Sequence, residues 1–208
     1  KEMMSGESLM VPDLVYYPTS HDFGYVLEDD TYQTTFEIWN GGTGTLTWNL
    51  GIVHTWISPF PTSGSSTGEH DTVTVTIDTT GLTPGSYSGF VSISANDGGG
   101  VQYFNVYCEV NSRQNVPSTP SGPAAGTAGV PYEYRTTAID SDGDEVQVRF
   151  DWDGSYSSWS PLASSGTTFI TNHAWSTPGT YHVKAQAKDE HGASSRWSSA
   201  LTATIIGS

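Results

Sequence analysis

The stretch Val73-Thr74-Val75-Thr76-Ile77 shows most directly which kind of fold this chain adopts. Large apolar side chains alternate with threonine, so the apolar ones face one side of an extended strand and the threonines face the other. Similar segments occur at 35–39, 46–50 and 89–93. Clusters of Gly, Pro, Asn and Ser separate them, as in turns between strands. The sequence therefore predicts an all-β fold.

A length of 208 residues fits two small domains, because a domain typically has about 100 to 150 residues. The strand signals pause in a segment that holds Pro117, Pro120 and Pro123 among Ser, Ala, Gly and Thr, which is typical of a stiff linker or an edge strand. We predict two tandem immunoglobulin-like β-sandwich domains joined by a short Pro-rich linker. The expected parts are an amino-terminal arm (1–11), a first sandwich (12–111), the linker with a leading strand (112–130) and a second sandwich (131–208).

The charge of the chain is strongly one-sided. There are 22 acidic and 7 basic residues, and no Lys or Arg lies between Lys1 and Arg113. Such a surface repels phosphate groups, so we expect neither nucleic-acid nor anionic-membrane binding. Acidity that keeps the molecule soluble and acidity that steers a cationic partner are both open. No apolar run reaches the roughly 18 residues of a membrane-spanning helix, so we expect no membrane insertion in this segment.

The single cysteine, Cys108, excludes an intrachain disulfide. It shares the alternation of Phe104, Val106 and Val110, so we expect it to lie buried on the apolar face of a strand as an inert thiol. The chain begins with Lys1 rather than Met. We therefore expect a processed protein or an excised segment of a longer one.

The first half resembles the BACON and HYDIN-like group of Ig-fold domains over residues 12–110. An ordered series of strand and turn motifs carries this resemblance: Asp22-Phe23-Gly24, residues 39–48, Trp56-Ile57-Ser58, residues 61–64 and residues 81–89. The resemblance implies an extracellular or surface sandwich that is often repeated in long chains. Carbohydrate binding has been proposed for such domains, but the motifs mark strands and turns and name no sugar site.

The second half is similar to the PKD (polycystic kidney disease) type of domain over residues 116–206. The residues that carry the similarity are 140–144, 150–154, His173-Ala174-Trp175, 178–183 and 187–192. In one departure from the family, Trp152 runs directly into Asp153-Gly154, so the local turn is shortened. The similarity implies a spacer or contact module of surface proteins, cell envelopes or secreted hydrolases.

Acidic residues around Gly143 form a candidate calcium site. Asp140, Asp142 and Asp144 alternate along a turn, and calcium prefers several oxygen ligands brought together in this way. Asp151 and Asp153 share one face of the next strand and are expected as further ligands. Asp189 would join them if its turn folds nearby. The alternative is a solvated hairpin whose aspartates cap their own turn. Calcium is the only cofactor that the sequence suggests, as a rigidifying ion.

No motif predicts catalysis. The stretch Gly64-Ser65-Ser66-Thr67-Gly68 satisfies G-x-S-x-G, but that motif needs a strand-to-helix elbow and here it lies in a loop. Asp151 and Asp153, as neighbours on one strand face, are too close and exposed for a glycosidase pair. The six histidines lack the spacing that zinc favours. We therefore predict that the chain is not an enzyme.

Three aromatic residues are candidate contacts for a ligand or partner: Trp39, Tyr156 and Trp159. Trp39 has the opposite parity to Phe36 and Ile38, and the other two fall in loops or at strand ends. Most other aromatic side chains are expected in the cores.

The predicted function is that of a non-catalytic extracellular structural or interaction protein, as a segment of a surface layer, sheath, filament or adhesin stalk. Its partners would be other copies of itself or other surface proteins, with the arm added to a sheet edge. The alternative is a carbohydrate-binding or adhesion module that accompanies a secreted enzyme and binds polysaccharide.

Overall fold

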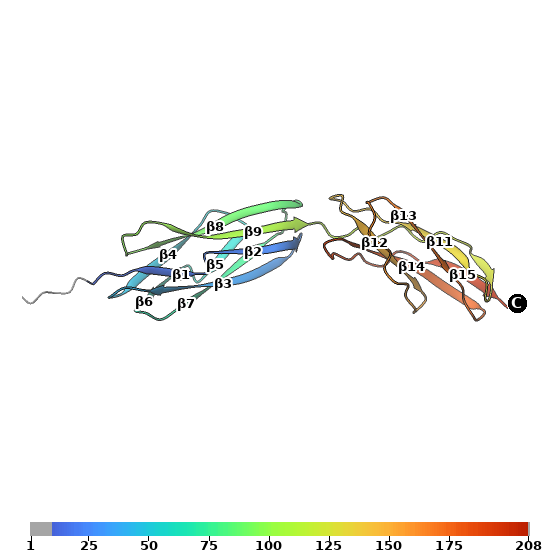
Figure 1. Cartoon of the computed structure of the whole chain (residues 1–208), viewed down its shortest axis with the longest axis horizontal. Helices are drawn as coiled ribbons and strands as arrows, with labels where there is room; N and C mark the ends of the chain where they lie inside the picture. Colours follow the sequence, from blue (N-terminus) through green and yellow to red (C-terminus); the bar gives the residue numbers. More distant parts are fainter. Residues whose placement is uncertain (1–9, 208) are drawn as a thin grey trace, which may run out of the picture. The chain divides into compact units, whose positions relative to one another are not determined.

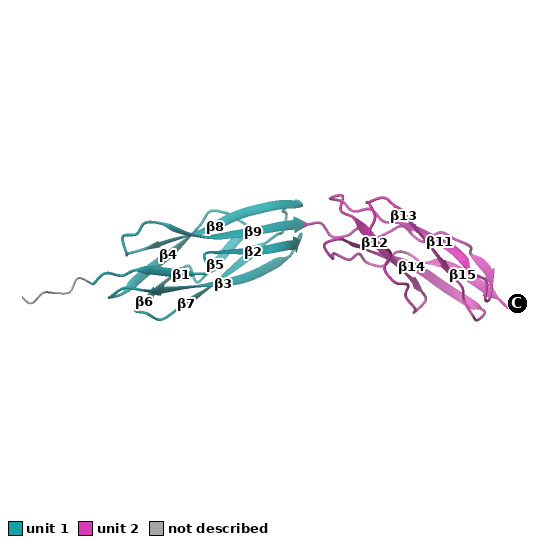
Figure 2. Cartoon of the chain, viewed as in Figure 1, with its two compact units in different colours: residues 1–110 teal, residues 111–208 magenta. Residues whose placement is uncertain are grey.

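The computed structural model describes residues 10–207 and divides the chain into two compact units (Figures 1 and 2). Unit 1 comprises residues 1–110 and unit 2 comprises residues 111–208. Residues 1–9, which make up most of the predicted arm, lie outside the described part. Between residues 10 and 207 all the regular elements are β-strands. The prediction of two tandem Ig-like β-sandwiches is confirmed.

Unit 1 is a sandwich of two sheets. One sheet has the strand order β1-β3-β7-β5, and the other has the order β2-β9-β8-β4-β6. The strands are β1 (Leu14–Tyr17), β2 (Ser20–Leu27), β3 (Thr31–Asn40), β4 (Leu46–Ile52), β5 (Ile57–Phe60), β6 (Ser63–Ser66), β7 (Asp71–Asp78), β8 (Gly85–Ala95) and β9 (Gln102–Asn111).

The core of unit 1 follows the predicted alternation. Val73, Val75 and Ile77 on β7 are fully buried, while the threonines between them are partly exposed. Phe36 on β3 stacks on Phe104 of β9 in the opposite sheet, with ring centroids 4.5 Å apart. Burial of one face of each sheet supplies most of the driving force for this fold.

Unit 2 also contains two sheets. The larger has the strand order β10-β15-β14-β12, and the smaller pairs β11 with β13. The strands are β10 (Ala125–Thr127), β11 (Tyr132–Thr137), β12 (Val146–Trp152), β13 (Thr168–His173), β14 (Gly179–Asp189) and β15 (Leu201–Ile206).

The core of unit 2 is rich in aromatic rings. Tyr134 is fully buried and packs edge-on against Trp152 and Trp175, at centroid distances of 5.5 and 5.7 Å. His173 stacks on Trp152 at 4.2 Å, and burial lowers the pKa of this histidine. Such ring contacts stabilise a core beyond the apolar area that they bury.

Much of the predicted Pro-rich linker is part of the second sandwich. Ser118 and Ser121 donate backbone hydrogen bonds to Thr137 and Arg135 of β11, and β10 pairs in parallel with β15. Two of the backbone donors between the prolines are therefore used in sheet pairing, although proline itself cannot donate. Of the two predicted parts of 112–130, the leading strand corresponds to this edge of the sandwich.

The described end of the predicted arm pairs within unit 1. The Thr43 backbone N–H donates to the Val11 carbonyl at 2.8 Å, and the Gly41 N–H donates to the Asp13 carbonyl at 2.9 Å. Residues 11–13 therefore lie along the β3–β4 connection of their own unit. The expectation that the arm packs on a sheet edge concerns mainly residues 1–9 and stays a prediction.

Candidate functional sites

Four aromatic side chains lie on the outer face of the five-stranded sheet of unit 1. We call them the tyrosine face: Tyr25 of β2, Phe90 of β8, and Tyr103 and Tyr107 of β9. The three tyrosines are 57%, 46% and 45% exposed, and Phe90 packs edge-on against Tyr103 at 5.0 Å. Tyr103 and Tyr107 alternate with the buried Phe104, Val106 and Cys108, so the pleat of β9 directs them outward.

Tyr25 reaches this face through a β-bulge. Phe23 and Val26 both contribute to the core although they are three residues apart. Gly24 between them has a φ of +63°, and its N–H donates to the Asp22 carboxylate at 2.8 Å. The extra residue shifts the alternation, so Tyr25 points away from the core.

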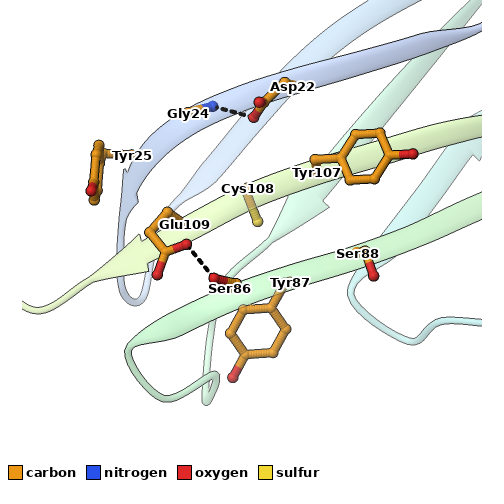
Figure 3. A pocket seen from close by; sticks show the side chains of 9 residues that line it. All are labelled: Asp22, Gly24, Tyr25, Ser86, Tyr87, Ser88, Tyr107, Cys108 and Glu109. Carbon is orange, nitrogen blue, oxygen red and sulfur yellow. Dashed lines mark hydrogen bonds between the residues drawn. The ribbon is translucent and has the colours of Figure 1, made fainter.

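Two adjoining depressions indent the tyrosine face and share Ser88 and Tyr107. The larger has a volume of 390 Å³ and is drawn in Figure 3. Its lining residues are Asp22, Gly24, Tyr25, Ser86, Tyr87, Ser88, Tyr107, Cys108 and Glu109. The smaller, of 270 Å³, is lined by His54, Ser88, Gly89, Phe90, Asn105 and Tyr107. The two depressions adjoin at Tyr107 along β8 and β9, and we call them together the groove.

The larger depression combines rings, hydroxyl groups and carboxylates. Ser86 Oγ donates to Glu109 Oε2 at 2.5 Å across the two strands (Figure 3). Burial, followed by the charges of Asp22 and Glu109, raises the pKa of the Cys108 thiol to about 11. The thiol is therefore protonated and buried, in line with an inert role. The groove can stack planar or ring-shaped groups and accept hydrogen bonds from them.

Trp39, a predicted contact residue, lies on the outer face of the other sheet of unit 1. Its ring stacks on His70 at 4.2 Å with an interplanar angle of 4°. His70 Nδ1 in turn lies 2.9 Å from Glu37 Oε2. One face of the indole is therefore covered by a neighbour from its own unit.

Tyr156 and Trp159, the other predicted contacts, belong to an aromatic and cationic cluster in unit 2. The Arg149 guanidinium lies 5.2, 4.8 and 5.2 Å from the ring centroids of Tyr156, Trp159 and Trp197. Lys188 Nζ lies 4.7 Å from the Trp159 centroid. We call these five residues the cation-π cluster. Stacking of this kind stabilises a partly exposed surface and uses ring faces that a ligand would otherwise meet.

Serines three residues apart fasten the segments that carry these rings to the sheet. Ser157 and Ser160 Oγ accept the backbone N–H groups of Phe150 and Val148 in β12. Each serine also donates its own backbone N–H to the same strand residue's carbonyl. The edge of β12 is thus paired by a segment that is itself not a strand.

The same device recurs along β14. Ser195 and Ser198 Oγ accept the backbone N–H groups of Ala187 and Ala185, at 3.0 and 2.9 Å. Their backbone N–H groups donate to the carbonyls of the same alanines. Residues 155–160 and 194–199 therefore cover the two outer sides of this part of the β12–β14 pair.

The predicted acidic site gathers at one end of unit 2. Single carboxylate oxygens of Asp140, Asp142 and Asp144 lie within 4.8 Å of one another. Asp140 is only 4% exposed, and its Oδ1 accepts the backbone N–H groups of residues 142, 143 and 144. Its Oδ2 is buried and accepts no hydrogen bond within the described residues, and the side chain that its carboxyl group meets is the carboxylate of Asp142. We call the three aspartates the acidic loop cluster.

Burial, mutual repulsion and hydrogen bonds shift the pKa values of the three aspartates in this cluster. Burial, followed by Asp142, raises the pKa of Asp140 to about 6. Burial also raises the pKa of Asp144, the negative charges of Asp142, Glu190 and Asp189 add to this rise, and His191 opposes it. For Asp142, burial is outweighed by hydrogen bonds from Asp140 and Ser112, which lower its pKa to about 2.

The turn after β14 lies beside the acidic loop cluster. His191 Nε2 is 3.4 Å from Asp144 Oδ2, and these two residues and Glu190 offer ligand atoms within 4.8 Å of one another. Asp189 is 1% exposed and accepts hydrogen bonds from Ala193 N–H and Asn111 Nδ2. The turn that carries Asp189 therefore folds near the loop, and the role of Asp189 as a calcium ligand stays a prediction.

Asp151 and Asp153 are not brought to this cluster. They lie at the far end of β12, which begins immediately after Glu145 and runs to Trp152. Asp151 Oδ1 accepts the Gly154 N–H at 2.8 Å, and Asp153 Oδ2 is 3.4 Å from His182 Nδ1. A strand of seven residues separates the two groups by roughly 20 Å.

Ser66, the serine of the G-x-S-x-G stretch, is fully buried on β6. Its Oγ donates to the Glu69 carbonyl at 2.6 Å and accepts the Asn40 N–H at 3.1 Å. These bonds give Ser66 a structural role in a turn.

Two features of the sequence carried signals that the prediction missed. Tyr103 and Tyr107 alternate with apolar residues of the opposite parity, which is enough to place them on the outer face of a strand. The pairs Ser157/Ser160 and Ser195/Ser198 each flank a tryptophan. The signal that the two segments share is the pattern Ser-x-Trp-Ser, at 157–160 and 195–198.

The two units define a class of protein built from tandem Ig-like modules, and comparisons with known families assign both. Residues 13–104 match the viral BACON domain, and residues 117–202 match the PKD domain. The chain therefore contains a BACON-type domain followed by a PKD-type domain. Both are non-catalytic Ig-like modules. The two predicted resemblances are confirmed.

Solved structures include similar chains. The PKD domain of an M14-like peptidase from Thermoplasmatales archaeon SCGC AB-540-F20 is 34% identical, with 46% of this chain and 97% of that chain covered and a TM-score of 0.43. A PapD-like domain of human CEP192 is 15% identical, with 53% and 99% covered and a TM-score of 0.42. A protein of unknown function from Porphyromonas gingivalis W83 is 8% identical, with 93% and 98% covered and a TM-score of 0.46.

The curated proteins contain no match to this chain. Within residues 10–207, no helix has the length and apolar character needed to cross a membrane.

Proposed function

We propose that this chain is a non-catalytic structural and interaction segment of an extracellular assembly, such as a surface layer, sheath, filament or adhesin stalk. The tyrosine face of unit 1 is the observation that carries the proposal. Tyrosine and phenylalanine are enriched at protein interfaces because rigid rings bury much apolar area at a small entropy cost. Four such rings on one sheet face form a patch, whereas single exposed apolar residues need no explanation.

The family assignment supports this proposal. PKD domains are typically extracellular, and both families found in the chain are non-catalytic modules. Unit 2 adds a second argument, because residues 155–160 and 194–199 occupy hydrogen-bonding groups that bare strands would offer to another chain. Contacts through a sheet face are therefore favoured over pairing at these edges.

The first candidate partner is a second copy of this chain. Sedimentation velocity of the purified chain over a wide concentration range tests this self-association. We expect the weight-average sedimentation coefficient to rise with concentration. A Tyr107→Thr variant, which keeps a residue suited to a strand, should lose that rise. Phe60→Ala removes an exposed ring from the opposite sheet and should keep it. A chain that stays monomeric throughout would contradict self-association.

Polysaccharide binding is a second candidate, favoured by the groove on the tyrosine face. Rings that stack on sugar faces stand beside serine hydroxyls and the carboxylates of Asp22 and Glu109, which can accept hydrogen bonds from sugar hydroxyls. Residues 10–110 contain no Lys or Arg, so neutral or amino sugars are favoured over acidic ones. A glycan array with the same two variants separates this candidate from self-association.

A further inference from the structure

The buried oxygen of Asp140 is the starting point. Asp140 Oδ1 is saturated by three backbone N–H groups, whereas Oδ2 is buried and accepts no hydrogen bond within the described residues. Burial of a carboxylate oxygen without a donor or a cation is costly, and such atoms are rare in folded proteins. The loop holds the Asp140 side chain in place, and its neighbour within the described residues is another carboxylate, that of Asp142. A partner that suits both carboxylates when they are ionised is a cation.

The neighbouring carboxylates point to a positive partner. Oxygens of Asp142 and Asp144 lie within 4.8 Å of Asp140, and Asp189 and Glu190 raise the negative charge around Asp144. Like charges at this separation repel strongly where burial limits the access of water. A divalent cation bound among the oxygens would both give Asp140 Oδ2 a partner and remove the repulsion.

We propose that the acidic loop cluster binds one calcium ion through the carboxylates of Asp140, Asp142 and Asp144. Calcium takes six to eight oxygen ligands in flexible geometry, which suits carboxylates presented by a loop. Zinc favours nitrogen and sulfur ligands in tetrahedral geometry, and His191 is the nearby nitrogen donor, already close to Asp144. Magnesium demands near-ideal octahedral geometry and loses its water ligands reluctantly, so a loop of carboxylates favours calcium over it.

The bound ion would also fix the first residues of unit 2. Ser112 donates to both oxygens of Asp142, from its backbone N–H at 2.8 Å and its Oγ at 2.6 Å. Asn111 Nδ2 donates to Asp189 Oδ2 at 3.0 Å. Calcium on Asp142 would hold that carboxylate in the position that Ser112 requires. The ion would thus order residues 111–112 against their own sandwich.

The test is calcium titration of the full chain after treatment with EDTA, by calorimetry and by hydrogen exchange. We expect one site, with a dissociation constant of about 10⁻⁴ to 10⁻³ M as in other extracellular modules. At ten times that concentration, exchange of peptides covering 111–115 and 140–145 should slow by about tenfold where opening requires release of the ion. Equal exchange with and without calcium would overturn the proposal.

Variants separate this site from the other aspartates. Asp140→Asn keeps an oxygen for the loop N–H groups and should abolish calcium binding, as should the more exposed Asp144→Asn if Asp140→Asn fails to fold. Asp151→Asn, at the far end of β12, is the matched control and should bind as the parent does. Calcium binding that survives in both Asp140→Asn and Asp144→Asn would refute the assignment.

Separate titrations with magnesium and with zinc complete the test. If zinc binds, if this binding is lost in His191→Gln and if calcium gives no response, the calcium proposal is wrong. The site would then be a zinc site made of Asp144, Glu190 and His191. The calcium site and the proposed function stand separately. Loss of the calcium response leaves the tyrosine face untouched, and a monomeric chain leaves the calcium site untouched.

Discussion

Arg149 and Gln186 are directly opposite each other on β12 and β14, and the arginine donates from both Nε and Nη2 to Gln186 Oε1 at 3.0 and 2.8 Å. This double hydrogen bond fixes the plane of the guanidinium. The plane then lies among the rings of Tyr156, Trp159 and Trp197, which come from segments on opposite sides of the strand pair. One side chain thereby joins both covering segments to the sheet.

Replacing Arg149 by Met keeps most of the aliphatic stem but removes the guanidinium. We expect unit 2 to lose about 1–3 kcal/mol of stability, from the lost ring contacts and the charged hydrogen bonds. Hydrogen exchange of peptides from β12 and β14 in the full chain measures this loss without contributions from unit 1. Lys184→Met removes a nearby cation that contributes to no described ring contact, so a loss as large in that control would contradict the special role of Arg149.

The segments 155–160 and 194–199, which serine hydroxyl groups fasten to the sheet, give a second prediction. Ser198→Ala leaves the buried Ala185 N–H without its acceptor, and an unsatisfied buried donor costs about 1–3 kcal/mol. Exchange of the Ala185 amide, followed by nuclear magnetic resonance, should accelerate by about fivefold or more. Ser199→Ala removes an exposed hydroxyl next to it and should leave that rate nearly unchanged. Equal effects of the two changes would show that the hydroxyl bond is not what protects β14.

Gly64 tests the packing between β4 and β6. A Cβ atom on Gly64 would overlap the ring of Trp48, which is itself almost completely buried and donates from Nε1 to Asp71 at 2.8 Å. Gly64→Ala should therefore destabilise unit 1 by about 1–3 kcal/mol, as overpacking does in other cores. Thermal unfolding followed by calorimetry measures the shift. Gly99→Ala, where the new atom would meet only the flexible Asp97 side chain, should shift the melting temperature little.

Cys108 should resist alkylation in the folded protein. The reactive species is the thiolate, and burial with two nearby negative charges raises the pKa of this thiol to about 11. Labelling should stay slow even at pH 8.5, where an ordinary cysteine is about half ionised. The same chain in guanidinium chloride should label quickly and completely. Fast labelling of the native protein would mean that β9 opens readily.

The sequence predicts those parts of the structure that depend on residues close together along the chain. Alternation along 73–77 and 103–110 predicts which side chains are buried, and Trp39 has the outward parity that it shows in the sheet. Alternation does not predict the outward position of Tyr25, because the bulge at Gly24 shifts the alternation. Only the positive φ of Gly24 reveals this shift.

Contacts between segments that are distant in the sequence could not be predicted from local patterns. Asp144 and His191 are almost fifty residues apart, and their meeting depends on how β12 and β14 pair. Strand geometry alone suggested Asp151 and Asp153 as companions of Asp144, because it gives the face of a side chain and not the turn that folds beside it. The same limit applies to Trp197, which reaches Arg149 from a segment that follows β14.

The most direct measurement is hydroxyl-radical footprinting of the side chains, at concentrations below and above the onset of association seen by sedimentation. We predict that Tyr103 and Tyr107 become protected as the chain associates, while Phe60 on the opposite sheet stays equally reactive. Association that leaves both tyrosines as reactive as in the dilute protein, or that protects Tyr156 and Trp159 instead, would contradict the assignment of the tyrosine face as the contact surface.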